Sequence, residues 1–311
     1  MAGMTWDFTV QLERYGPDRE APPSSAAEAW QYCRWVAHTH YENFSVASLL
    51  LPRRLLRHFH AVYAYCRWAD DLADEAGDPA RATALLAWWR KQLLACYRGE
   101  ARHPVFVALG QTIRTFGIPP EPFLALLAAF EQDQRVHSYA TFDDLLGYCV
   151  NSANPVGRLV LYLLEAHDDE RGRLSDDICT ALQLANFWQD VARDLDLGRV
   201  YLPVEDRVRF GYPDDDLHAL RFTPAFASLL RFEVDRTRDL FFRGYPLVDL
   251  VPAEARADIE LFIEGGLAIL KKIEKVGYNV LDRRPALAKW EKGMLVAGAL
   301  WRRVRGLVQV G

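Results

Sequence analysis

Two short segments of the chain place pairs of aspartates at the spacing of one helical turn. Asp70 precedes Asp74 by four residues, and Asp190 precedes Asp194 by the same interval. Residues four apart lie on one face of an α-helix, where like charges repel each other by about 0.2–0.5 kcal/mol per pair. Two such pairs in otherwise apolar segments indicate that the carboxylates hold a cation.

Other polar residues continue each acidic stripe in helical register. Arg67 lies three residues before Asp70, whereas Gln183 and Asn186 lie seven and four residues before Asp190. The residues between them in the second segment are apolar: Leu184, Phe187, Trp188 and Val191. Carboxylates are seldom buried without a partner, so a polar stripe on an apolar helix predicts a ligand.

The residue types indicate which ligand. Carboxylate and amide oxygens suit hard cations such as Mg²⁺, which keeps several waters and is completed by substrate phosphates. Aspartate pairs that face each other would clamp Mg²⁺ and a diphosphate, so that a carbon–oxygen bond ionises in a dry apolar cavity. The nine Trp, thirteen Tyr and sixteen Phe of the chain either line such a cavity, where their ring faces steer a carbocation, or fill a core.

A simpler interpretation makes each stripe a solvated helix face with ion pairs such as Arg67 with Asp71. That interpretation suits a single DxxxD motif. Two DxxxD motifs, one with Gln and Asn in register, favour the metal site. The chain offers no nucleophile–base pair and no glycine-rich phosphate loop as a rival site.

The elements that position these residues are predicted to be helices. Apolar residues recur at intervals of three and four almost throughout, and Pro and Gly divide the chain into roughly ten helices. Residues 1–24 are expected to form a loosely held N-terminal arm, and residues 25–311 a single all-α catalytic domain. The irregular span from Gly198 to Pro224 is expected to be a lid or a surface excursion.

Composition excludes several classes of protein. The net charge of −5 argues against a nucleic-acid-binding protein. Five scattered cysteines without CxxC spacing support neither a zinc site nor a disulfide framework. Because the chain has no signal peptide and no apolar run long enough to span a bilayer, we expect a cytoplasmic protein that at most touches the inner face of a membrane. The oligomeric state is left open.

Written out, the two motifs resemble the signatures of the squalene/phytoene synthase family, which condenses isoprenyl diphosphates head to head. The segments Tyr63-x-x-Cys66-Arg67-x-x-Asp70-Asp71-x-x-Asp74 and Gln183-x-x-Asn186-x-x-x-Asp190-x-x-x-Asp194 carry the resemblance, followed by Gly198-Arg199-Val200-Tyr201-Leu202-Pro203. It runs from about Ala27 to Arg284. The resemblance implies an isoprenoid-synthase helical bundle around a central apolar cavity, with Mg²⁺ as cofactor and an isoprenoid diphosphate as substrate.

The resemblance also implies roles for individual residues. Asp70, Asp74, Asp190 and Asp194 would bind metal with Asn186, and Tyr148 would lie near the reacting carbons. The residues that would contact the substrate come from four parts of the chain: His40, Asn43, Tyr63, Arg67, Gln183, Asn186 and Arg283. Taken singly, each of these residues also has a simpler interpretation. His40 could be a packed or exposed histidine and Arg283 a surface charge. Tyr63 and Tyr148 could be core residues.

Three stretches make the chain most similar to the hydroxysqualene synthases of bacterial hopanoid pathways: His40-Tyr41-Glu42-Asn43-Phe44 with Leu50-Leu51-Pro52, Ser152 to Arg158, and Asn186 to Asp194. Gln189 stands where phytoene and dehydrosqualene synthases carry arginine. Asn154-Pro155 replaces a small-residue turn, and Gly266 an aromatic residue. These departures favour an enzyme that accepts presqualene diphosphate and captures the cation with water, without NADPH. The alternatives are a synthase that condenses two farnesyl or geranylgeranyl diphosphates to squalene, dehydrosqualene or phytoene, and a catalytically silent assembly factor.

Overall fold

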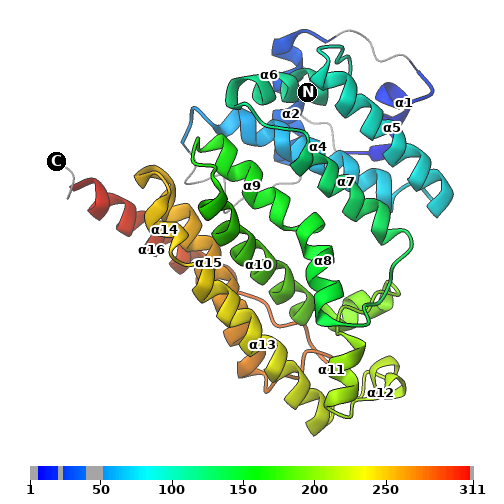
Figure 1. Ribbon diagram of the computed structural model, residues 1–311, viewed down its shortest axis with the longest axis vertical. Helices are drawn as coiled ribbons and strands as arrows, with labels where there is room; N and C mark the ends of the chain where they lie inside the picture. The colour runs from blue at the N-terminus through cyan, green and yellow to red at the C-terminus, as the bar shows by residue number, and fades with distance from the viewer. Residues whose placement is uncertain (1–5, 20–23, 40–51, 309–311) are drawn as a thin grey trace. The chain divides into compact units, whose positions relative to one another are not determined.

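The computed structural model describes residues 6–19, 24–39 and 52–308, with side chains as far as Arg302 (Figure 1). In these ranges every regular element is a helix, and the one strand-like pairing is an isolated bridge between Ser138 and Val200. The predicted all-α class is therefore confirmed. No helix among the described residues is both long and apolar enough to cross a bilayer.

Contacts between residues group the chain into two compact units, and the single domain expected from the sequence stays a prediction. The first unit comprises residues 1–135 and 159–167, and the second comprises residues 136–158 and 168–311. The helices of the first unit are α1 Phe8–Tyr15, α2 Ala26–Thr39, α4 Leu56–Asp74, α5 Pro79–Tyr97, α6 Pro104–Phe116 and α7 Glu121–Asp133. Helix α9, Asn154–Leu163, contributes residues to both.

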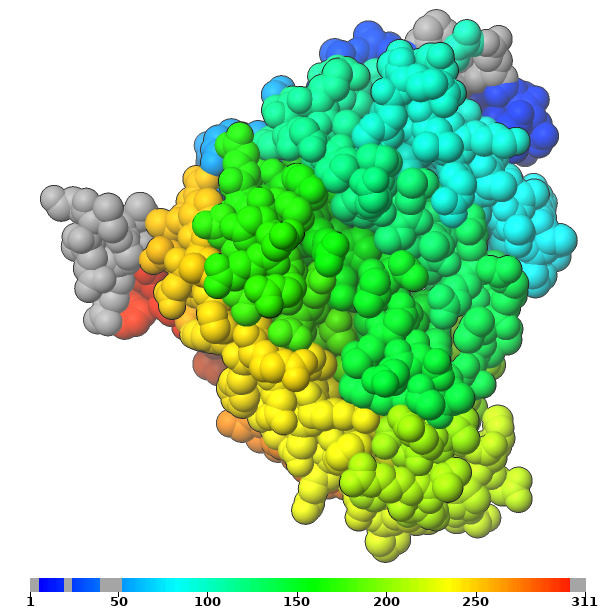
Figure 2. Space-filling view, in the orientation of Figure 1, coloured from blue at the N-terminus to red at the C-terminus, as the bar shows by residue number. Residues whose placement is uncertain are grey.

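The second unit holds the remaining helices: α8 Phe142–Ser152, α10 Asp169–Asp196, α11 Val204–Arg209, α12 Asp214–His218, α13 Pro224–Gly244, α14 Leu247–Leu250, α15 Ala253–Lys275 and α16 Lys289–Val308. The described part of the chain thus has more helices than the ten expected, because α11, α12 and α14 are too short to show a helical period. Two of these short helices lie in the Gly198–Pro224 span. Figure 2 shows that span as a surface continuous with α13.

Within the expected N-terminal arm, residues Phe8–Tyr15 form helix α1. Asp7 caps α1 by accepting a hydrogen bond from the Val10 amide, as an N-cap aspartate does. Phe8, Gln11 and Tyr15 are buried along one face of the helix, and the Tyr32 hydroxyl donates to Gln11 Oε1 at 3.0 Å. The spacing of these three residues is helical, but the charged residues around them concealed the apolar face.

An aromatic core holds α4 in the first unit. The Trp68 ring stacks on Trp89 at 5.3 Å and meets the edge of His103 at 4.7 Å, and the Trp68 Nε1 donates to the Tyr32 hydroxyl. Burial lowers the pKa of His103 to about 3, so this histidine is neutral. Because large rings clamp the buried face of α4, its acidic stripe has a fixed orientation within the unit.

A buried polar chain ties α10 to α13 in the second unit. The Trp188 Nε1 donates to Thr237 Oγ1 at 2.8 Å, and that hydroxyl donates to the Glu233 carbonyl. The Glu233 carboxylate pairs with Arg236, which also binds Asp206 on α11. Trp188, two residues before Asp190, therefore has a satisfied hydrogen bond in the core.

Glu233 makes the stability of the protein depend on pH. Burial raises the pKa of Glu233 to about 8 from 4.5, against the opposing charge of Arg236. The folded state therefore binds a proton more tightly than the unfolded state, so stability is lost as the pH rises from about 4.5 to about 8. We predict that Glu233→Gln flattens this part of the plot of unfolding free energy against pH in urea titrations. Asp235→Asn, on the same helix but 56% exposed, should leave the slope unchanged.

Gly266 shows why the expected aromatic residue is absent from α15. A Cβ atom at Gly266 would lie 2.8 Å from Cε1 of Phe241, a fully buried ring of α13. The glycine thus makes room for an aromatic ring supplied by another helix. Gly266→Ala is predicted to lower the free energy of unfolding by about 1–3 kcal/mol through overpacking.

The neighbouring Gly265 is the matched control. A Cβ atom there meets nothing within 4 Å, so Gly265→Ala should be neutral or stabilising, by up to about 1 kcal/mol from helix propensity. Urea unfolding of both variants makes the comparison. Equal effects of the two substitutions would show that the contact with Phe241 has no energetic consequence.

Candidate active site

The acidic stripe of α4 divides into an exposed and a buried part. Asp74 is exposed, and the side chain of Asp70 is 43% accessible. Arg67 and Tyr63 lie one and two turns before Asp70, respectively, on the same face and are half-buried. Burial raises the pKa of Tyr63 to about 12, and Arg67 opposes that rise, so this phenol keeps its proton and can donate a hydrogen bond.

Arg67 carries the positive charge of the α4 stripe. Its guanidinium donates to Asp70 Oδ2 at 3.0 Å, binds Asp71 on the other side and lies 3.7 Å from Glu75. Asp71 is buried and also accepts from the Trp6 Nε1 at 3.1 Å. The simpler interpretation of the sequence placed the Arg67–Asp71 ion pair on a solvated helix face. In the structure the Asp71 side of this pair is buried, so Asp71 has a structural role.

The stripe of α10 begins with half-buried Gln183 and exposed Asn186 and continues with half-buried Asp190 and Asp194. Asp168 caps the start of this long helix by accepting from the Arg171 amide. The predicted residues therefore lie on one face of one helix, within a single unit. Apolar Leu184, Phe187, Trp188 and Val191 are buried on the other side, as the sequence pattern predicts.

A segment after α15 reaches the acidic end of α10. Arg284 binds Asp190 through both Nε and Nη2, the latter at 3.0 Å, and Nη2 also donates to Gln189 Oε1 at 3.0 Å. The Gln189 side-chain amide donates to the carbonyl of Pro285. Gln189, which replaces an arginine expected from the family, thus helps to hold another arginine against the aspartate.

Asp194 lies in a different electrostatic environment from Asp190. Burial, and after it the negative charge of Asp190, raise the pKa of Asp194 to about 7, against the opposing charges of Arg199, Arg193 and Arg284. A carboxylate that is desolvated and repelled in this way is stabilised by any cation that binds beside it.

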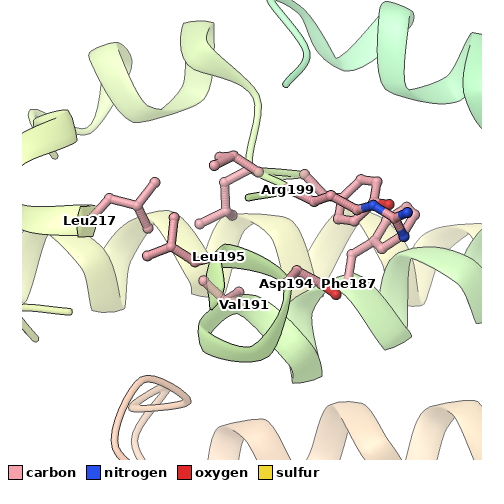
Figure 3. A pocket seen from close by; sticks show the side chains of 9 residues that line it. Phe187, Val191, Asp194, Leu195, Arg199 and Leu217 are labelled. Atoms are coloured by element: carbon pink, nitrogen blue, oxygen red, sulfur yellow. The ribbon is translucent and has the colours of Figure 1, made fainter. Parts of the chain in front are cut away.

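A small apolar pocket opens beside Asp194 (Figure 3). Its volume of about 230 Å³ includes open solvent at its mouth, so the enclosed space is much smaller than this. Asp194 and Arg199 are its charged groups, and its apolar lining includes Phe187, Val191 and Leu217. The pocket therefore supplies part of a binding site, with a carboxylate at the edge of an apolar space.

Four aromatic rings gather behind this pocket. Tyr148 lies within 6.2 Å of Phe187 and 6.0 Å of Tyr201, and the latter two stack at 3.7 Å. Tyr139 completes the group, held by a hydrogen bond from the Val204 amide to its carbonyl. Electron-rich faces of this kind stabilise a nearby cation. Tyr148, predicted to lie near the reacting carbons, is buried here and within one ring of the pocket wall.

The donor set of the two helices fits a hard divalent cation. Each stripe offers two carboxylates one turn apart, and the desolvation and repulsion at Asp194 are what a bound cation would relieve. Among the residues that the structure describes, no three acidic, His or Cys side chains already form an ion cage. Mg²⁺ at Asp190 and Asp194, or at Asp70 and Asp74, would thus keep open positions for water and diphosphate oxygens.

Of the three remaining predicted residues, the structure describes only Arg283. His40 and Asn43 lie outside the described residues. Arg283 is exposed, whereas its neighbour Arg284 binds Asp190. Sequence reasoning missed Arg284, because two adjacent arginines in a loop cannot be distinguished by a helical period. It also missed Arg199 and Tyr201, although both belong to the Gly198–Pro203 motif that it identified.

The ion pair between Arg284 and Asp190 competes with any metal for the same oxygens. We predict that Arg284→Gln strengthens Mg²⁺ binding to the protein about two- to fivefold, a modest effect because the arginine is 46% exposed. Titration calorimetry measures the affinity. Arg283→Gln is the control and should change nothing. Weaker Mg²⁺ binding by the Arg284 variant would show instead that the arginine organises the site.

Comparison with a family model agrees with the two motifs. Residues 37–291 match the model of the family described as squalene/phytoene synthase. Among characterised proteins, the chain is 32% identical to a phytoene synthase of Thermus thermophilus over 89% of this chain and 94% of that protein. It is 30% identical to a 15-cis-phytoene synthase of Synechocystis sp., with 96% and 91% of the two chains covered.

Solved structures show the same fold. The crystal structure of squalene synthase HpnC from Alicyclobacillus acidocaldarius superposes with a TM-score of 0.79 at 47% identity, covering 83% of this chain and 97% of that one. A dehydrosqualene synthase in complex with a ligand gives a TM-score of 0.80 at 26% identity, covering 89% and 97%.

Proposed function

This chain belongs to the squalene/phytoene synthase family and is a prenyltransferase-type enzyme, and from that premise we propose that it converts presqualene diphosphate into hydroxysqualene with Mg²⁺. The observation that carries the proposal is Gln189, which stands where phytoene and dehydrosqualene synthases carry arginine. The 47% identity to squalene synthase HpnC, over nearly the whole of that protein, supports a squalene-type substrate. The phytoene synthases compared above are only 30–32% identical.

The proposed reaction needs no external oxidant or reductant. The carbon–oxygen bond to diphosphate breaks, one cyclopropane carbon–carbon bond opens, and the oxygen of a water molecule bonds to the resulting cation and loses a proton. The products are hydroxysqualene, diphosphate and a proton. No reductant enters, which agrees with a sequence that offers no nicotinamide-binding motif.

Bound Mg²⁺ would supply the positive charge that stabilises the leaving diphosphate. The carboxylates of Asp190 and Asp194 would hold the ion on α10, and those of Asp70 and Asp74 would hold it on α4. Gln183 and Asn186 offer amide groups on the same face of α10.

Cationic and aromatic groups complete the proposal. Arg67 and the phenol of Tyr63 are proposed to bind diphosphate oxygens on the α4 side, where charge-assisted hydrogen bonds are strong. Tyr148 and the stacked rings of Phe187 and Tyr201 stabilise the carbocation. His40, Asn43 and Arg283 remain proposed substrate contacts.

A second candidate reaction is the condensation of two farnesyl diphosphates to squalene or dehydrosqualene, or of two geranylgeranyl diphosphates to phytoene. The similarity to phytoene synthases over as much as 96% of the chain favours it. Both candidates use the same acidic stripes, so they differ in substrate and product only.

Product analysis separates the candidates. The full chain is incubated with Mg²⁺ and presqualene diphosphate in oxygen-18 water without NADPH, and the expected product is a triterpene alcohol that carries the label. Farnesyl and geranylgeranyl diphosphates are supplied in parallel, with and without NADPH. Formation of a hydrocarbon from these substrates with no labelled alcohol from presqualene diphosphate would overturn the first proposal in favour of the second.

A further inference from the structure

The last helix of the second unit has one face packed on the protein and one face of large apolar side chains turned to solvent. Helix α16 runs beside α15 (Figure 1). On its inner face, Ala299 is fully buried and Arg302 binds Glu260 and Glu264 of α15, each at 2.7 Å. Near its start Glu291 binds Lys272 at 2.7 Å. These contacts fix which face of α16 points away from the unit.

The outward face is apolar. Trp290, Met294 and Trp301 lie at i, i+4 and i+11, hence on one side of the helix, and they are 64%, 60% and 55% exposed. Ala297 falls between them in register and is exposed too, and Leu300 at 47% widens the stripe. Large apolar side chains gathered on one exposed face mark an interaction surface.

The charge of α16 identifies the kind of surface that fits. The protein as a whole is acidic, with a net charge of −5, but the twenty residues of α16 hold five Lys or Arg against one Glu. Of these, Lys289 is exposed at the flank of the apolar stripe, whereas Lys292, two residues after Trp290, is exposed on the other side of the helix. Tryptophan on one face with lysine and arginine at its flanks is typical of helices that lie in the headgroup region of a bilayer.

Two further observations favour a membrane over an internal role. The match to the family model ends at residue 291, so nearly all of α16 lies beyond the segment that the model matches. The helix also carries too many charges to be a spanning segment, and no described helix qualifies as one. A surface helix of this composition lies parallel to the bilayer rather than across it.

We propose that α16 docks the second unit on an anionic lipid bilayer, with Trp290, Met294 and Trp301 inserted into the interface and Lys289 facing the lipid headgroups. The proposal does not depend on which isoprenoid diphosphate the enzyme takes. It adds a location for the reaction, because water-insoluble isoprenoids partition into the bilayer to which the enzyme would bind.

Sedimentation with vesicles tests the proposal. The full chain is mixed with vesicles of phosphatidylcholine alone or of phosphatidylcholine with phosphatidylglycerol. We expect at least about tenfold stronger binding to the anionic vesicles, and a decrease of at least about tenfold on Trp290→Ser/Met294→Ser/Trp301→Ser, because three large apolar groups no longer insert. Lys289→Gln should weaken binding to anionic vesicles only, and added salt should weaken it likewise.

Val208→Ser/Phe222→Ser is the matched control, since these residues of the same unit are 74% and 41% exposed but lie outside α16. It should bind vesicles like the parent, and circular dichroism should show the same helix content for all variants. Unchanged binding by the triple variant overturns the proposal. A second outcome would also overturn it: analytical ultracentrifugation shows a concentration-dependent dimer of the parent that the triple substitution abolishes. A second copy of the chain would then cover this face.

Discussion

Replacing Asp190 and Asp194 together by asparagine is expected to lower kcat at least about a thousandfold with the fold intact. The substitutions keep the shape of the side chains but remove both negative charges from the acidic end of α10. Charge stabilisation of a leaving group contributes several kcal/mol to such reactions, and the amides cannot hold a divalent cation as tightly. The measurement is turnover of the preferred isoprenoid diphosphate over a range of Mg²⁺ concentrations.

The control for this pair is Asp196→Asn. Asp196 ends the same helix and is exposed, and it lies outside the register of the stripe, so its turnover should equal that of the parent. Thermal unfolding of each variant shows whether the fold survives. A double variant that retains turnover within tenfold of the parent would refute a metal-binding role for α10.

Replacing Asp71 by alanine is expected to lower the free energy of unfolding by about 3–5 kcal/mol, the usual cost of breaking a buried ion pair. Its carboxylate is 1% exposed, accepts from the Trp6 Nε1 and pairs with Arg67. Burial raises the pKa of Asp71 to about 7, and Arg67 opposes that rise. The variant would leave the indole and the guanidinium each short of an acceptor.

The adjacent Asp70→Ala is the matched comparison. Its carboxylate also binds Arg67 but is 43% exposed, so we expect a loss of stability below about 1 kcal/mol. Turnover should respond in the opposite way, with a large loss for Asp70→Ala, because Asp70 lies on the stripe proposed to hold metal. Urea unfolding and steady-state kinetics measure the two effects. Equal losses of stability would contradict the division of Asp70 and Asp71 between function and structure.

Several features of this protein can be predicted from short segments of the sequence. The all-α class follows from the period of apolar residues, because the residues on the buried face of a helix recur at a fixed spacing. The same period places Asp190 and Asp194 with Asn186 on one face of α10, as the structure confirms. The two motifs are local as well, so they identified the family without any knowledge of tertiary contacts.

Other features depend on residues far apart in the sequence. Arg284 rather than Arg283 meets Asp190 across 94 residues, and no periodicity of a loop distinguishes them. Asp71 and Asp70 are adjacent on one helix, yet only the packing of Trp6 and the α4 core decides which is buried. The glycine at position 266 is likewise explained only by the Phe241 ring of another helix, which occupies the space of a side chain.

The division has a simple physical basis. Helical period and motif spacing are fixed by backbone geometry within one or two turns, so the sequence alone determined the helices, their acidic faces and the family. Burial, ion pairing and close packing are set by which distant side chains share a space. Only the tertiary structure could therefore decide which aspartate is an anchor, which arginine reaches the acidic stripe and which face of the last helix is left open to solvent.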